Sequence, residues 1–372
     1  MTTKEEIIAQ AYKLGFSDIG FATIEPFESQ KEVLISRAND YEWLKVSGMD
    51  LMAGTEPKKL FPEARSIIVL INVYFHSAYP SHMEYHFGRC YMDDDRITRD
   101  GLSLKVRAFI KYLSENQINL KFLPNLSDRL SAVRAGLGTY GKNCLFYSNK
   151  AALKSSWVSP IAIVVDKEFE PDIPTDEIGC PEWCKNACLV ACPTGALKGP
   201  RHLNPLKCIS YLSYYDSGIT AKEFREPMGL RIYGCDHCQN VCPRNAPWLS
   251  QKLPVNEKVK AKEKYFELRS LLHMDVKYFE THIWPHMFYM PSKDIWRWKM
   301  NAARAMGNTC DPEYVPDLIL ACKENNDERS CGMAAWALGR IGGVKAKSAL
   351  EELFKSSTGL VRDEIVEALK RL

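Results

Sequence analysis

The stretch that decides the fold is CPEWCKNACLVACP, which runs from Cys180 to Pro193 and repeats cysteine every four residues. A second group of four cysteines, which also ends in Cys-Pro, follows between positions 208 and 243. Eight of the chain's 13 cysteines therefore fall within one short region. In a chain of 372 residues, such clustering favours thiol ligands for a metal centre over disulfide bonds.

Each group resembles the way in which ferredoxins ligate a [4Fe-4S] cluster. Three thiolates come from one short loop and the fourth comes from a distant Cys-Pro. In two-cluster ferredoxins, the last cysteine of each group therefore binds the cluster of the other group. The sequence thus predicts a ferredoxin-like insert with two clusters. The predicted ligands are Cys180, Cys184, Cys188 and Cys242 for one cluster, and Cys208, Cys235, Cys238 and Cys192 for the other.

The spacing leaves two other interpretations open. Bacterial ferredoxins use C-x2-C-x2-C-x3-C-P, whereas the first two gaps here are each one residue longer. A four-residue period is also typical of a buried stripe on a helix, although Pro181 and Pro193 disfavour one unbroken helix. Two four-cysteine zinc sites tolerate looser spacing but do not explain the Cys-Pro ends. The other cysteines are predicted to be ordinary buried thiols: Cys90, Cys144, Cys310, Cys322 and Cys331.

Upstream of the cysteines, residues 1–170 are predicted to form an α/β domain. Residues 4–14 have the periodicity of an amphipathic helix. Two nearly continuous β-branched runs, at 66–75 and 160–165, predict strands that are buried on both faces. A further helix is expected at 101–114, between these strands.

The acidic, proline-bearing stretch 166–176 marks a domain boundary, which places the double-cluster domain at 171–289. Beyond it the pattern is helical and repeats, because NAARAMG at 301–307 returns as MAAWALG at 333–339. Small residues at fixed helical positions allow paired helices to stack, and a period of roughly 30 to 45 residues is typical of HEAT-like solenoids. We therefore predict an all-α HEAT-like domain at 290–372, suited to docking a partner.

The composition is that of an ordinary globular protein. Hydrophobic residues make up 46% of the chain and charged residues 26%, with a formal net charge of +3, so nucleic-acid binding is permitted but not indicated. No run of about 18 apolar residues is present, and the chain starts directly with an amphipathic helix in place of a leader. We therefore expect a cytoplasmic protein that does not enter a membrane.

Several motifs together resemble the epoxyqueuosine reductase family over nearly the whole chain. Besides the cysteines and the helical repeats, they are GFSD at 15–18, ARSII at 64–68, RAGLG at 134–138 with GKN at 141–143, CISYL at 208–212 and RIYGC at 231–235. The resemblance implies an α+β multidomain fold in which a nitroreductase-like α/β domain binds cobalamin. Electrons from a flavodoxin or ferredoxin would pass through two [4Fe-4S] clusters to form Co(I). A monomer is implied, with repeats that contact tRNA.

The resemblance also assigns residues to the cofactor. The glycine-rich loop would contact the corrinoid, because glycines allow the main chain to approach a flat macrocycle closely. Taken alone, the same loop is equally typical of a tight turn before a strand. The cobalamin-binding residues that the resemblance implies are Arg134, Gly136, Leu137, Gly138, Gly141, Lys142 and Asn143.

The chain departs from the family's pattern at the proton donor. Epoxyqueuosine reductases place an aspartate seven residues before an arginine that corresponds to Arg129, and Phe122 stands at that acid position here. Asp128 is the nearest carboxylate, although adjacent side chains on an extended segment point to opposite faces. Tyrosines donate the proton in related dehalogenases, so Tyr74 and Tyr91 complete the set of catalytic candidates with Asp128 and Arg129.

Three functions therefore stay open on the sequence. The first is the family's reaction, the reduction of epoxyqueuosine to queuosine in tRNA. The second is a cobalamin-dependent reductase of a small electrophile such as an organohalide, which is favoured by Phe122 and by the acidic segment 91–96. The third is a non-catalytic electron-transfer or corrinoid-reducing protein that docks a partner through the repeats.

Overall fold

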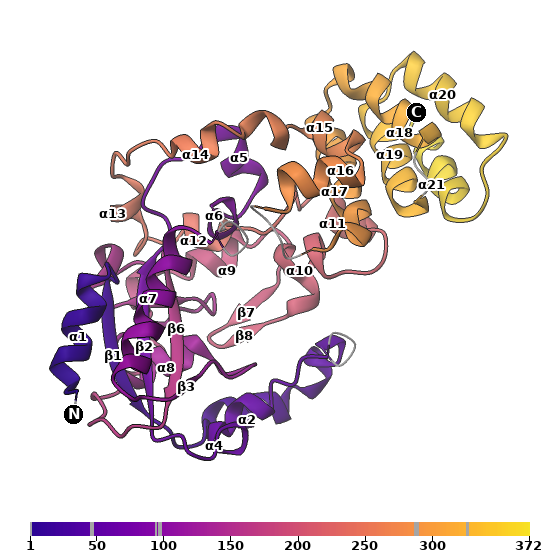
Figure 1. Ribbon diagram of the computed structural model, residues 1–372. Coiled ribbons are helices and arrows are strands. Elements are labelled where there is room, and N and C mark those ends of the chain that lie inside the picture. The colour runs from indigo at the N-terminus through magenta and orange to yellow at the C-terminus, as the bar shows by residue number, and fades with distance from the viewer. Residues whose placement is uncertain (1, 45–47, 94, 96–98, 286–289, 325–326) are drawn as a thin grey trace. The chain divides into compact units, whose positions relative to one another are not determined.

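The computed structural model describes residues 2–44, 48–93, 95, 99–285, 290–324 and 327–372, and the chain divides into two compact units (Figure 1). The first unit comprises Met1–His76, Arg99–Pro205 and His237–Lys252. The second comprises Ser77–Thr98, Leu206–Asp236 and Leu253–Leu372. These units interleave along the sequence, whereas the domains predicted at 1–170, 171–289 and 290–372 are consecutive, so that division stays a prediction.

A four-stranded antiparallel sheet in the order β1-β2-β6-β3 forms the centre of the first unit. Its strands are β1 (Asp18–Thr23), β2 (Ser66–Val73), β3 (Leu120–Lys121) and β6 (Val158–Val165). Strands β2 and β6 pair from Ser66 opposite Val165 to Val73 opposite Val158. Every residue of β2 except Val73 is buried, which confirms the prediction of a central strand covered on both faces.

Helices cover both faces of this sheet. Helices α1 (Lys4–Lys13) and α7 (Gly101–Glu115) pack with Phe21, Ile68 and Ile163 into one hydrophobic core. Helix α8 (Asp128–Arg134) buries its apolar side chains on β1, β2 and β6. The helices predicted at 4–14 and 101–114 are thus confirmed, because each presents an apolar stripe to the sheet.

The remaining elements of the first unit are short. They are α2 (Glu28–Ser36), α4 (Pro57–Leu60), β4 (Gly138–Tyr140), β5 (Phe146–Ser148), α9 (Ala187–Ala191), β7 (Leu197–Gly199), β8 (His202–Leu203), α12 (His237–Asn240) and α13 (Ala246–Leu249). Lys185 and Asn186, with φ of 48° and 58°, adopt left-handed conformations just before α9. The cysteine-rich stretch is therefore not one continuous helix, and the interpretation of its cysteines as a helical stripe is wrong.

The second unit is helical and ends in the predicted repeats. Helices α17 (Ile295–Thr309), α19 (Glu328–Ile341) and α21 (Gly359–Leu369) pack in succession, with α18 (Val315–Glu324) and α20 (Val344–Phe354) between them in sequence. A Cβ on Gly307 would lie 2.9 Å from the Cα of Ala337, and one on Gly339 would lie 2.6 Å from the Cβ of Ala368. The repeated small residues therefore allow close helix contact, as predicted.

The other helices of the second unit precede the repeats. They are α5 (Ser81–His86), α6 (Arg89–Met92), α10 (Ile209–Tyr214), α11 (Lys222–Arg225), α14 (Glu257–Lys260), α15 (Leu268–His273) and α16 (Val276–Tyr278). Across the described ranges, no helix combines the length and the apolar character that a membrane span requires.

Candidate metal centre

One predicted set of cluster ligands comes together within the first unit. Cys184 ends a 3-10 turn, Cys188 lies in α9, and Cys180 and Cys242 lie in loops before and after these elements. Burial raises the pKa of the Cys188 thiol to about 11, and the other three sulfurs of the set add to this rise. Thiolates that converge in this way repel each other, and positively charged iron offsets that repulsion.

The geometry of this set differs from that of a single-ion site. Among the described residues, no three His, Cys, Asp or Glu side chains lie close enough together to hold one metal ion. In a cubane cluster each thiolate binds a different iron, so its four sulfurs lie further apart than the ligands of one ion.

Hydrogen bonds connect the glycine-rich loop to the cysteine-rich segment. The N–H of Lys142 donates to Cys180 Sγ over 3.2 Å, and Lys142 Nζ donates to Asn186 Oδ1 over 2.6 Å. The main-chain oxygen of Tyr140 accepts a hydrogen bond from the N–H of Gly179 over 3.0 Å. An N–H that donates to a ligating sulfur stabilises its charged form and tunes an attached cluster.

The glycines of this loop are required by the chain's own packing. A Cβ on Gly138 would overlap the main-chain oxygen of Tyr147, and a Cβ on Gly141 would overlap its ring. Asn143 Nδ2 donates to the same tyrosine's hydroxyl over 3.0 Å. Gly136 has a φ of 68°, which favours glycine. The glycines thus serve the β4–β5 hairpin, and they do not by themselves leave space for a ligand.

A small cavity of about 220 Å³ lies beside the loop in the first unit. Tyr140 Oη and Ser127 Oγ meet there at 3.4 Å, and Glu177 forms an ion pair of 2.7 Å with Arg201. Gln30 Oε1 is buried in the same lining without a hydrogen-bond partner among the described residues. A buried acceptor in this position is satisfied by a hydrogen bond from water or from another donor.

The other predicted ligand set draws on both units. Cys192 and Cys238 belong to the first unit, whereas Cys208 and Cys235 belong to the second. Cys208 is the N-cap residue of α10. Cys235 packs against the hydrophobic cluster that contains Leu212. Cys208 and Cys235 are therefore each positioned by packing within the second unit.

Tyr74 takes part in a hydrogen-bonded network that holds the last cysteines. Its hydroxyl accepts from Gln239 Nε2 over 3.1 Å, and this amide also donates to Ser156 Oγ over 2.9 Å. Asn245 Nδ2 donates to the same serine over 2.9 Å. The network fastens the segment around Cys238 to the ends of β2 and β6. Sequence reasoning missed the amides, although their positions beside Cys238 and the second Cys-Pro were a signal for them.

Tyr91 lies in a buried aromatic cluster of the second unit. Its hydroxyl is 3.2 Å from that of Tyr214, and its ring lies against Tyr233. Burial raises the pKa of Tyr91 well above its usual value. Asp93, in the acidic segment, forms an ion pair of 2.9 Å with Lys258. Positions 94 and 96 of that segment lie outside the described residues.

Asp128 and Arg129 make structural contacts at the start of α8. Asp128 Oδ1 accepts the N–H of Ala162 over 2.8 Å, and burial raises the pKa of this carboxyl group. Arg129 instead donates to the main-chain oxygen of Cys144 over 3.0 Å, so the two side chains have different partners. They begin helix α8 and do not lie on the extended segment that the sequence argument assumed. Phe122, at the family's acid position, leaves 43% of its surface exposed.

Two further residues of the predicted cobalamin-binding set, Arg134 and Leu137, are held by contacts within the first unit. Arg134 donates to the main-chain oxygens of Glu25 and Pro26 and stacks 3.8 Å from the ring of Phe27, so its guanidinium is engaged by α2's N-terminal segment. Burial lowers its pKa. Leu137 is buried. The structure thus brings the predicted loop beside one cysteine set through Lys142, whereas Arg134 contacts residues 25–27.

Two family descriptions match parts of the chain. A 4Fe-4S double cluster binding domain matches residues 180–245. HEAT repeats match residues 293–370. The ferredoxin-like double-cluster segment and the C-terminal HEAT repeats that the sequence predicts are therefore both present.

Whole proteins are similar to the chain as well. An epoxyqueuosine reductase of Listeria monocytogenes is 32% identical over 387 residues, which cover 95% of this chain and 93% of that protein. An epoxyqueuosine reductase structure from Bacillus subtilis, whose catalytic loop is swung out of the active site, matches with a TM-score of 0.80 and 29% identity over 99% of this chain and 98% of that one. A crystal structure of epoxyqueuosine reductase with an epoxyqueuosine-modified tRNA stem loop matches equally, with a TM-score of 0.80 and 29% identity over the same shares.

Proposed function

This chain belongs to the epoxyqueuosine reductase family of oxidoreductases, and we propose on that premise that it reduces epoxyqueuosine to queuosine in tRNA. The observation that carries the proposal is the convergence of four thiols around Cys188, with the Lys142 N–H directed at Cys180. Removal of an epoxide oxygen as water leaves an alkene and consumes two electrons and two protons. A chain with two clusters is suited to delivering such electrons one at a time.

The cluster ligands are part of the proposal. The chain carries a double [4Fe-4S] cluster domain, and we assign its first cluster to the set around Cys188 that ends at Cys242. The second cluster is assigned to the set with Cys192, in accordance with the exchange of last ligands in two-cluster ferredoxins. Both assignments are supported by the ligand chemistry, since all eight positions are cysteines, whose thiolates are the usual ligands of [4Fe-4S] clusters.

Cobalamin is the proposed catalytic cofactor, and the residues beside the clusters fit part of it. The cavity next to Tyr140 is large enough for a fragment of a corrinoid, although not for the whole cofactor. The main chain of the loop from Gly138 to Asn143 is the proposed contact. When bound, cobalamin supplies a strongly reducing and nucleophilic metal centre.

The proton has to come from a residue other than the family's aspartate, because Phe122 carries none to give. The proposed candidates are still Asp128, Arg129, Tyr74 and Tyr91. The contacts of Asp128 with Ala162 and of Tyr74 with Gln239 support positioning roles for these two side chains.

Further parts of the proposal follow from the tRNA substrate. We place the protein in the cytoplasm, where tRNA is modified, and infer that it acts as a monomer reduced by a flavodoxin or ferredoxin. The C-terminal repeats are the proposed tRNA-contacting surface, supported by the related structure that holds a tRNA stem loop. Trp296 and Trp298 are buried, so their aromatic rings stabilise the repeats and other side chains must meet RNA.

A second candidate is the reduction of a small electrophile such as an organohalide. The observation that favours it is Phe122, which replaces the family's acid with an exposed apolar side chain. Reductive removal of a halide needs two electrons and one proton. This is one proton fewer than removal of the epoxide oxygen as water, so the reaction depends less on an internal acid.

Anaerobic incubation with tRNA separates these candidates. tRNA from a strain that accumulates epoxyqueuosine is mixed with the reduced, cobalamin-loaded protein, and nucleosides are analysed by mass spectrometry. Formation of queuosine, and its loss in Cys188→Ala, supports the first function. If no queuosine forms while an aspartate-containing relative converts the same tRNA, the first function is excluded and organohalides are tested next.

A further inference from the structure

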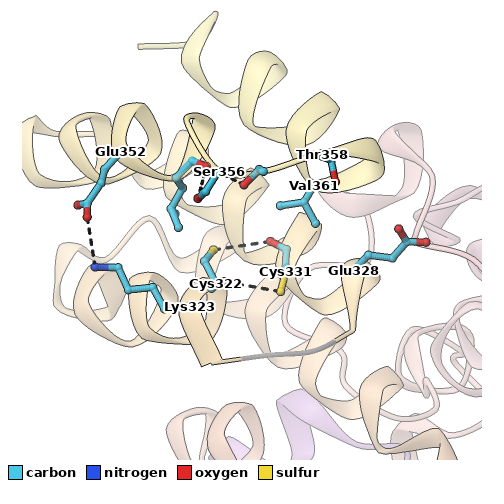
Figure 2. A pocket seen from close by; sticks show the side chains of 10 residues that line it. Cys322, Lys323, Glu328, Cys331, Glu352, Ser356, Thr358 and Val361 are labelled. Atoms are coloured by element: carbon cyan, nitrogen blue, oxygen red, sulfur yellow. Dashed lines mark hydrogen bonds and ion pairs between the residues drawn. The ribbon is translucent and has the colours of Figure 1, made fainter.

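A cavity of about 500 Å³ in the C-terminal repeats contains two cysteines that the proposed reduction does not use (Figure 2). Helices α18, α19 and α20 and the segment before α21 contribute to its lining. Cys322 lies in α18 and Cys331 in α19, and both line the cavity. Neither is part of a disulfide.

The two thiols reach across to each other's main chain. Cys322 Sγ lies 3.7 Å from the carbonyl oxygen of Cys331, and Cys331 Sγ lies 3.8 Å from that of Cys322. Figure 2 shows these two reciprocal contacts as dashed lines between the neighbouring helices. Because each sulfur touches the other residue's backbone, the two side chains lie next to each other. A disulfide requires such adjacent residues and the rotation of their side chains toward one another.

The cavity gives small polar molecules a path to the thiols. Lys323 and Glu352 form an ion pair of 3.9 Å in its lining, and their side chains are 50% and 69% exposed. Ser356, Ser357 and Thr358 add hydroxyl groups to the same lining. Charges of both signs and hydroxyls suit a zwitterionic thiol compound better than an apolar ligand.

We propose that Cys322 and Cys331 are a reversible redox pair, which a small disulfide that enters the cavity oxidises to an intramolecular disulfide between α18 and α19. The thiolate of one cysteine attacks the small disulfide, which releases one thiol and leaves a mixed disulfide on the protein. The second cysteine loses its proton and displaces the other half. The two protein thiols thus lose two electrons in total, and one small disulfide is reduced to two thiols.

The surroundings of the pair limit how much of each thiol is present as the reactive thiolate. Burial, together with the nearby Asp327, raises the pKa of Cys331 to about 11, while Lys299 acts in the opposite direction. Burial and the neighbouring Cys331 raise the pKa of Cys322 further above its usual value. Because burial raises the pKa of both thiols, the oxidation is slow near neutral pH and faster in alkaline solution.

Peptide mapping tests the pair without reference to catalysis. The purified full-length protein is incubated with oxidised glutathione, alkylated and digested with trypsin, which cleaves after Lys323 and Arg329. A disulfide joins the peptides 305–323 and 330–340, and dithiothreitol separates them again. Phenylarsine oxide, which bridges neighbouring thiols, is expected to bind the folded reduced protein at this pair.

Cys310 provides the matched control, because it is exposed and lies in the same tryptic peptide as Cys322. Cys310→Ser should retain the linked peptides and the arsenical binding, whereas Cys322→Ser and Cys331→Ser should lose both. Only glutathione adducts on single cysteines, or a link that requires Cys310, would overturn the proposal. If a serine variant of the pair fails to fold, Cys310→Ser decides alone, because a link between these two peptides can then come only from Cys322, and loss of reductase activity has no bearing on it.

Discussion

Phe122 follows β3 and leaves 43% of its surface in solvent, and the sequence resemblance predicts an acid at this position. An exposed phenylalanine gains little stability from burial, so its presence is not explained by packing. The missing acid concerns the proton-donating side of the proposed reaction and not the proposed cluster ligands, which are all cysteines.

Restoring the acid is the most direct test at the scale of one residue. Phe122→Asp is expected to raise the rate of epoxyqueuosine reduction by about 10- to 100-fold, because a positioned general acid contributes at least this much. Turnover of modified tRNA by mass spectrometry is the measurement. Phe122→Asn, which has nearly the same shape but no acid, serves as the control. Equal rates for both variants would show that the missing carboxyl is not what limits this chain.

His86 makes the stability of the protein depend on pH. Its Nδ1 lies 2.8 Å from the oxygen of Leu230, and burial lowers its pKa to about 4. The unfolded chain binds this proton near pH 6.5, so stability is lost as the pH falls from about 6.5 to 4, by up to about 1.4 kcal/mol per pH unit. As the pH decreases from 7.5 to 5, the melting temperature of His86→Gln should decrease less steeply than that of the wild type. The exposed control His202→Gln should match the wild type; a wild-type slope in His86→Gln would refute the assignment.

Successive repeat helices contact each other through small residues, and this is the main feature at the scale of elements. The chain repeats glycine and alanine where α17 meets α19 and where α19 meets α21. Close approach brings many atoms into contact, and each contact contributes a small dispersion energy. Helix packing in this region therefore depends on side-chain size more than on hydrophobicity.

Gly339→Ala tests this dependence. The added Cβ would lie 2.6 Å from the Cβ of Ala368, so α19 and α21 must separate. We expect the free energy of unfolding to decrease by about 1–3 kcal/mol, despite the better helix propensity of alanine. Urea denaturation followed by circular dichroism measures it. Gly218→Ala, where an added Cβ has no atom within 4 Å, should leave the free energy of unfolding unchanged. An unchanged free energy of unfolding in Gly339→Ala would show that α19 and α21 accommodate the extra methyl group.

A buried ion pair connects α11 to the last repeat helix. Arg225 donates to both carboxylate oxygens of Glu364 over 2.7 Å, with side chains that are 2% and 6% exposed. Glu364→Gln should cost about 3–5 kcal/mol of unfolding free energy, because it leaves a buried cation without its partner.

A double variant separates the pair from the charge that is left behind. Arg225→Met combined with Glu364→Leu should be clearly more stable than Glu364→Gln in the same denaturation experiment, since neither charge stays buried. Glu367→Gln, at an exposed pair with Lys370, should leave the unfolding midpoint unchanged. A double variant as unstable as the single one would indicate that packing, and not charge, dominates at this site.

The clusters belong to the scale of the whole molecule, because their ligands come from segments that are far apart in the chain. Anaerobic reconstitution should give about eight irons per wild-type chain and about four for Cys188→Ala. Iron analysis and electron paramagnetic resonance of the reduced protein measure this. Cys310→Ala should keep the full content. Two tightly bound zinc ions in place of iron would contradict the cluster assignment.

Much of the architecture was predictable because the responsible signals are local. The β-branched run at 66–75, the helix at 101–114 and the NAARAMG repeat each depend on residues that are close in sequence. Cysteine spacing likewise predicts a cluster from ligand chemistry alone. The interleaving of the two units was not predictable, since it depends on which distant segments pack together.

The sequence by itself determined the kind of metal centre, the buried strands and the repeats, because thiol spacing and hydrophobic periodicity are properties of neighbouring residues. Only the tertiary structure decided what the candidate catalytic side chains contact. Asp128 meets Ala162 and Tyr74 meets Gln239, and these partners lie 34 and 165 residues away in the chain. Hydrogen bonds over such separations depend on the packed fold, so no local pattern could have revealed these contacts.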